Sequence, residues 1–132
     1  MKIAFDIGGV LSKYPKIFKE LIIALEAGGA DVYIISDMGH TKISEMLSLN
    51  QIYILPGNIY SADYAAYGEN CKKILCEELK IDIFVDDFIG YVAEGDFVRL
   101  LVMPNPKFDY YDESWKTDGS EGNFGRRRIN GT

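Results

Sequence analysis

The sequence contains one histidine, two cysteines and no run of about 18 apolar residues. Structural zinc sites need clustered cysteine and histidine side chains, and His40 with the pair Cys71 and Cys76 does not make such a cluster. The two cysteines are five residues apart, which also excludes a redox Cys-x-x-Cys pair. We expect two buried thiols in a reducing compartment. The missing apolar run excludes a transmembrane helix, and the first residues lack a signal peptide. We therefore expect a cytoplasmic protein.

An excess of basic charge is also missing. The formal net charge is -6, so we expect no nucleic-acid partner, since such proteins normally present a basic surface. The hydrophobic and charged fractions, 48% and 26%, are those of an ordinary globular protein, and 132 residues suffice for one core. We expect one domain over residues 1–116. Residues 117–132, rich in glycine, asparagine and charge and containing Arg126, Arg127 and Arg128, are expected to form a flexible tail.

Apolar runs of strand length alternate with segments of helical periodicity along most of the chain. The sequence predicts strands over residues 2–5, 32–35, 52–55, 81–85 and 97–103. It predicts helices over 17–27, 41–49 and 71–79, the last capped by Asn70, and a short helix or ordered loop over 61–67. This alternation is typical of the α/β class: a three-layer, doubly wound (Rossmann-like) parallel sheet, here of about five strands, with helices on both faces.

Polar residues end three of the predicted strands: Asp6, Ser36 and the pair Asp86-Asp87. In an open parallel sheet, ligands bind at the carboxyl ends of the strands. Carboxylates that converge there raise one another's pKa values unless a cation lies between them. Mg²⁺ is the natural candidate, because one or two carboxylates with phosphate and water commonly hold it.

A lysine on the helix before the fourth strand is also expected to reach this edge. With Leu75 at the centre of the buried stripe, Lys72 lies about 60° away around the helix and Lys73 about 160° away. Lys72 can therefore follow the buried face toward the site, while Lys73 should point to water. An ammonium group there would balance carboxylate and phosphate charge, as in phosphoryl-transfer sites.

These residues, in this order, resemble the haloacid-dehalogenase (HAD)-like hydrolase superfamily over roughly residues 1–105. Four segments carry the resemblance: the first strand with its nucleophile, Ile3 to Leu11; the second strand with its hydroxyl, Val32 to Ser36; the helix lysine, Lys72; and the acidic pair after the fourth strand, Phe84 to Asp87. A response-regulator receiver shares the architecture, but its acidic pair follows the first strand, which does not fit.

The resemblance implies a Mg²⁺-dependent phosphatase or phosphotransferase. Asp6 would attack a phosphate ester and form an aspartyl-phosphate that water later hydrolyses, with Lys72 as its catalytic partner. The implied phosphate-binding groups are the Ser36 hydroxyl, the Lys72 ammonium and the backbone N–H groups of Ile7, Gly8 and Gly9. The implied metal ligands are Asp6, the carbonyl of Gly8 and Asp86, with Asp87 bonding to the metal's water shell.

One position departs from the family pattern. Phosphatases of this superfamily carry a second Asp two residues after the nucleophile, as general acid for the leaving group, and here that residue is Gly8. Loss of a general acid commonly costs a factor of about 10²–10⁴ in rate. Three outcomes stay open: weak hydrolysis of substrates with good leaving groups, a donor recruited from Asp37 or His40, or phosphate binding without turnover.

The spacing of these motifs leaves no room for a cap domain. We expect an open site, covered at most by the loop of Tyr60, Tyr64 and Tyr67, acting on a phosphorylated small molecule or protein. Capless members also find cover in a partner subunit, so a homo-oligomer is one expectation. An aromatic segment near the end of the chain comprises Phe108, Tyr110, Tyr111 and Trp115. It could form the surface that contacts a partner subunit, form a flap at the edge of the site, or pack on the domain's own core. The alternatives to an enzyme are an impaired relative that binds metal and a phosphorylated ligand, and a purely structural interaction domain.

Overall fold

The computed structural model describes residues 1–87 and 99–102. In the described chain, the strands are β1 (Lys2–Phe5), β2 (Asp31–Ser36), β3 (Ile59–Ser61), β4 (Ile83–Asp86) and β5 (Arg99–Val102). They form one sheet in the order β3-β2-β1-β4-β5, in which every neighbouring pair is parallel. The chain order reverses between β1 and β4, so the topological switch point lies at these two central strands. The predicted α/β class with a parallel sheet is confirmed.

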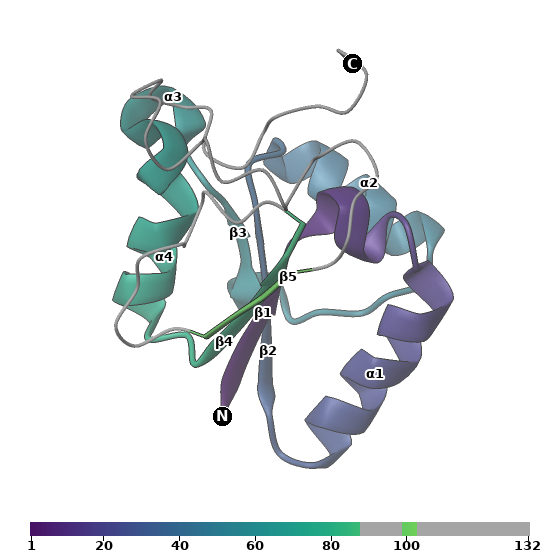
Figure 1. The fold of residues 1–132 in the computed structure, drawn as a ribbon. Helices are drawn as coiled ribbons and strands as arrows, with labels where there is room; N and C mark the ends of the chain where they lie inside the picture. Colours follow the sequence, from purple (N-terminus) through teal and green to yellow (C-terminus); the bar gives the residue numbers. More distant parts are fainter. Residues whose placement is uncertain (88–98, 103–132) are drawn as a thin grey trace, which may run out of the picture.

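Helices cover both faces of the sheet (Figure 1). On one face lie α1 (Pro15–Ala27) and α2 (His40–Leu49), whose side chains Phe18 and Ile43 share a buried cluster with Phe5 of β1. On the other face lies α4 (Cys71–Leu79), whose Cys76 packs with Phe84 of β4. Successive residues of a strand point to opposite faces, so apolar side chains on both sides are required here. Because the core packs on both faces, the central strands hold the residues at their carboxyl ends in place.

The remaining elements are short turns and one short helix. They are a 3₁₀ turn (Pro56–Asn58), α3 (Tyr64–Tyr67), a second 3₁₀ turn (Gly68–Asn70) and, after β1, the wide turn Ile7–Leu11. The short helix expected over 61–67 is thus present as α3, and α1 and α2 begin one or two residues before their predicted starts. Asn70 occupies the N-cap position of α4, as predicted, but its side chain makes no capping hydrogen bond.

The third strand was predicted in the wrong place. Residues 52–55 alternate between buried and exposed, as a strand would, with Ile52 and Ile54 inside. They form no strand, because the N–H of Ile52 donates to the carbonyl of Leu47 at the end of α2, 2.9 Å away. The pairing position beside β2 belongs to β3, where Ile59 lies opposite Ile34.

Both cysteines are free and buried, as expected. Within the described residues no helix is long and apolar enough to cross a bilayer. The predictions for the aromatic segment, Phe108 to Trp115, and for the tail over 117–132 lie outside the described residues.

Candidate functional site: three carboxylates and a buried lysine

The first carboxylate lies where β1 ends and the chain turns. Asp6 keeps an extended backbone, and its N–H donates to the carbonyl of Val85 on β4, 2.9 Å away, which joins the ends of the two central strands. Its side chain is only 5% exposed. Such a polar side chain, directly after a buried strand, has no solvent to stabilise its charge and must find partners within the protein.

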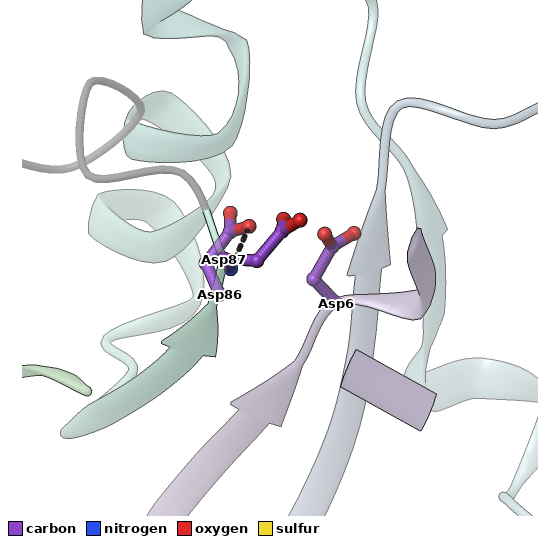
Figure 2. A group of neighbouring side chains, drawn as sticks. All are labelled: Asp6, Asp86 and Asp87. Atoms are coloured by element: carbon purple, nitrogen blue, oxygen red, sulfur yellow. Dashed lines mark hydrogen bonds between the residues drawn. The ribbon is translucent and has the colours of Figure 1, made fainter. Parts of the chain in front are cut away.

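The next two carboxylates come from β4. Asp86 is its last residue, fully buried, and Asp87 follows half-buried. The backbone N–H of Asp87 donates to Asp86 Oδ1 at 2.7 Å, and this bond holds the Asp86 side chain in place. Figure 2 shows the carboxylates of Asp6, Asp86 and Asp87 gathered beyond the ends of β1 and β4. One oxygen from each lies within 4.8 Å of the others, a spacing that a single cation can bridge.

Lys72 brings a positive charge into this cluster from α4. Its Nζ lies 3.2 Å from Asp6 Oδ1 and 3.0 Å from Asp86 Oδ2, and its side chain is 1% exposed. The expected contact of Lys72 with the strand ends is therefore present. The predicted helix orientation was nevertheless inaccurate: Cys71, Lys72 and Cys76 are the buried residues of α4, Leu75 is half-buried, and so is Lys73, which was expected to point to water. Lys72 lies on the buried face, between Cys71 and Cys76 around the helix.

Burial dominates the electrostatics of the cluster. Loss of hydration raises the pKa of Asp6, and the Lys72 ammonium opposes that rise. The pKa of Asp86 is raised well above its ordinary value, first by burial and then by the Asp6 carboxylate, again opposed by Lys72. Three carboxylates against one ammonium leave two negative charges when all are ionised (3 − 1 = 2). A divalent cation would bring that sum to zero.

One oxygen of the cluster has a charged neighbour but no aligned hydrogen-bond donor in the described chain. Asp6 Oδ1 is buried and accepts no hydrogen bond within the described chain, although the Lys72 ammonium lies 3.2 Å away as an ion-pair partner. Buried oxygens without a donor are uncommon and often mark an ion, water or ligand position. The donor set consists of hard oxygen ligands at a buried sheet edge, which suits Mg²⁺ better than a softer metal.

The turn after β1 approaches the carboxylates closely. Gly9 has a φ of +73°, and a Cβ at this residue would clash with the Asp87 carboxylate. Glycine therefore suits both the left-handed backbone and the close approach of the Asp87 side chain. The N–H of Gly9 donates to Ser12 Oγ at 3.2 Å, so this donor, expected to bind phosphate, already has an internal partner that a phosphate oxygen would have to replace.

Ser36 lies at the end of β2, beside β1, and is fully buried. Its Oγ accepts a hydrogen bond from the N–H of Met38 at 3.1 Å, which forms a tight turn after the strand. The structure thus brings together four predicted site residues: Asp6, Lys72, Asp86 and Asp87. Ser36 lies at the neighbouring strand end, where its hydroxyl oxygen already accepts a hydrogen bond from Met38.

The two candidate replacements for the general acid lie at the surface. Asp37 and His40 are both exposed. His40 begins α2 and lines a separate surface hollow, whose other described lining residues are Thr41, Ser44, Glu45, Ser48 and Leu49. Sequence reasoning missed Met38, whose methyl group lies next to Gly8. A methionine in a loop carries no periodic signal that would have identified it.

Comparisons with family models, with curated proteins and with solved structures gave no match for this chain.

Proposed function

We propose that this protein is a Mg²⁺-dependent phosphatase or phosphotransferase of the HAD-like type, with Asp6 as the nucleophile. The observation that carries the proposal is the pairing of Lys72 Nζ with both Asp6 and Asp86, at 3.2 and 3.0 Å, at the switch point of a parallel sheet. A buried ammonium between two strand-end carboxylates is a costly arrangement, and such clusters are concentrated at functional sites.

The proposed ligand set combines the three neighbouring carboxylates with the metal-binding positions that the resemblance implies. Asp6, Asp86 and the Gly8 carbonyl would hold Mg²⁺, with Asp87 bonding to its water shell. When bound, the metal would neutralise charge on the carboxylates and on the phosphoryl oxygens. Lys72 would hold a phosphoryl oxygen while it keeps Asp6 oriented, and the Ser36 hydroxyl and the N–H groups of residues 7–9 would donate hydrogen bonds to the others.

Asp6 would then act in two steps. Its carboxylate oxygen attacks phosphorus, the bond to the leaving group breaks, and an aspartyl-phosphate forms. Water next attacks the phosphorus, and the Asp6 carboxylate and inorganic phosphate are released. The proposed substrate is a phosphorylated small molecule or protein, reached through a site without a cap domain.

A second candidate function is metal and phosphate binding without turnover. Gly8 favours it, because this residue cannot supply the proton that a poor leaving group requires. In that case Mg²⁺ with beryllofluoride, a phosphoryl mimic, would raise thermal stability while no substrate is hydrolysed.

The test is release of inorganic phosphate, with and without Mg²⁺, from a panel of phosphate esters and acyl phosphates. The proposal predicts Mg²⁺-dependent release that Asp6→Asn abolishes. Asp31→Asn is a matched control, because Asp31 is an exposed carboxylate at the opposite end of β2. Absence of release from every substrate, or release unchanged in Asp6→Asn, would contradict the enzymatic proposal.

A further inference from the structure

One face of the sheet is covered over its central strands but not over the edge strand β5. Phe5 of β1, Val85 of β4 and Leu101 of β5 are partners in register, so their side chains lie on the same face, on which α1 and α2 pack. Phe5 and Val85 are buried, whereas Leu101 is 53% exposed. Within the described chain, the apolar cover of this face therefore ends at β4.

Exposed apolar side chains of α1 border the same uncovered area. Ile17 is 65% exposed and Leu21 is 41% exposed. At 100° per residue, these two lie about 60–140° around the helix from its buried residues, Phe18 and Ile22. In a right-handed connection from β1 through α1 to β2, that side of α1 faces β4 and β5. We call Ile17, Leu21 and Leu101 the apolar strip.

The apolar strip has the width of one further packed element. Neighbouring strands lie about 4.8 Å apart, so β5 is roughly 10 Å from β1, and packed helices lie about 8–10 Å apart. Parallel sheets are normally covered on both faces, because their strands are apolar on both sides. An element beside α1 would therefore complete the layer over β4 and β5.

We propose that residues 104–116 of this same chain pack on the apolar strip. Val102 ends β5 opposite Asp86, at the carboxyl edge of the sheet, and residues 103–132 follow it. Residues 103–107 can span about 17 Å when extended, which exceeds the roughly 13 Å length of a four-residue strand, so the chain can return alongside β5. A right-handed crossover places the connection over residues 88–98 on the α4 face, so that connection does not compete for the strip.

The sequence of this segment fits the strip. Phe108, Tyr111 and Trp115 recur at i, i+3 and i+7, the spacing of one apolar helix face, and Asp109 and Glu113 fall on the other side. Aromatic side chains bury large apolar areas, which matches a strip made of isoleucine and leucine. The proposal concerns the fold and does not depend on the proposed chemistry at Asp6.

Trp115 provides the test, because it is the only tryptophan of the chain and its fluorescence reports on this segment without any labelling. In the folded full chain, the proposal predicts that Trp115 emits at shorter wavelength and is quenched less by acrylamide than in the same protein unfolded in urea. Both properties should be independent of protein concentration. Emission and quenching equal to those in urea would overturn the proposal, because the indole would then be in water.

Two variants test the location. Ile17→Glu and Leu101→Glu each place a charge on the strip, so each should shift Trp115 emission to longer wavelength and raise its quenching by acrylamide. Leu49→Glu is the matched control and should change neither, because Leu49 is an exposed leucine at the end of α2, outside the strip. Ile17→Glu alters an exposed helix residue, so the test holds even where Leu101→Glu disrupts the edge strand.

Two results would overturn the proposal although Trp115 is shielded in the wild-type protein. Shielding that Ile17→Glu leaves unchanged, with far-UV circular dichroism showing a folded variant, would mean that the segment packs elsewhere. Shielding that is lost on dilution, together with a fall in molecular mass measured by light scattering, would assign the strip to a second copy of the chain.

Discussion

Replacing Lys72 by methionine removes the ammonium that lies between Asp6 and Asp86. The side chain keeps nearly the same length, so the change is chiefly one of charge. At an effective dielectric constant of about 20, an ion pair about 3 Å apart has a Coulomb energy of roughly 5 kcal/mol, and Lys72 makes two such pairs. In the variant, the two carboxylates can take up protons, which offsets part of the lost Coulomb energy. We therefore expect a net loss of about 3–5 kcal/mol in the free energy of unfolding at neutral pH without metal.

The assay is urea unfolding of Lys72→Met beside Lys73→Met. Lys73 is on the same helix, half-buried, and makes no ion pair in the described chain, so its replacement should change stability by no more than about 0.5 kcal/mol. Equal losses in the two variants would refute the reasoning, because the buried charge pairs would then contribute nothing.

The dependence of this loss on pH provides a second check. Burial raises the folded-state pKa of Asp6 and of Asp86, so the folded protein binds protons more tightly than the unfolded chain. Stability of the metal-free protein must then fall as pH rises above the ordinary aspartate value of 3.8 and through the raised values. Without Lys72 both carboxylates protonate still more readily, so the loss should shrink as pH is lowered. A loss that stays constant from neutral to acidic pH would contradict this account.

Two further predictions concern the metal and the turn after β1. At about 100 times its dissociation constant, Mg²⁺ should stabilise the protein by about 2.7 kcal/mol in a thermal melt, an effect lost in Asp86→Asn and kept in the exposed control Glu26→Gln. Gly9→Ala should weaken Mg²⁺ stabilisation because its methyl group displaces the Asp87 carboxylate from the metal's water shell. Gly29→Ala, also at positive φ but with open space around it, should show only the backbone strain of about 1–2 kcal/mol. Retention of the full Mg²⁺ effect in Asp86→Asn or Gly9→Ala would contradict the proposed ligand set.

The strand ends were predictable because burial and chain direction act locally. A parallel sheet places every carboxyl end at one edge, so an apolar run that stops at Asp6, or at Asp86, indicates the site without any knowledge of pairing. Lys72 was found in the same way, since helical periodicity places it near the buried face. That Lys72 is more deeply buried than Leu75 was not predictable, because Leu75 is the more apolar residue and hydrophobicity alone gives it the buried position.

The parts that failed depend on tertiary contacts. The alternation over residues 52–55 correctly indicates which side chains are buried, but hydrogen bonding depends on what lies beside them. There the end of α2 accepts from Ile52, while Asn58 donates to the carbonyl of Val32 at 3.0 Å and directs the following residues into β3. Met38 was missed for a related reason: its proximity to Gly8 joins two loops that no local pattern connects.

The central claim is that Asp6 is the residue that accepts phosphate. The most direct measurement is mass-spectrometric mapping of the protein after incubation with acetyl phosphate and Mg²⁺ and rapid quenching in acid. The account predicts a phosphoryl group on Asp6, dependent on Mg²⁺ and absent from Asp6→Asn. Phosphorylation at another residue, or none under conditions where Mg²⁺ binding is saturated, would contradict it.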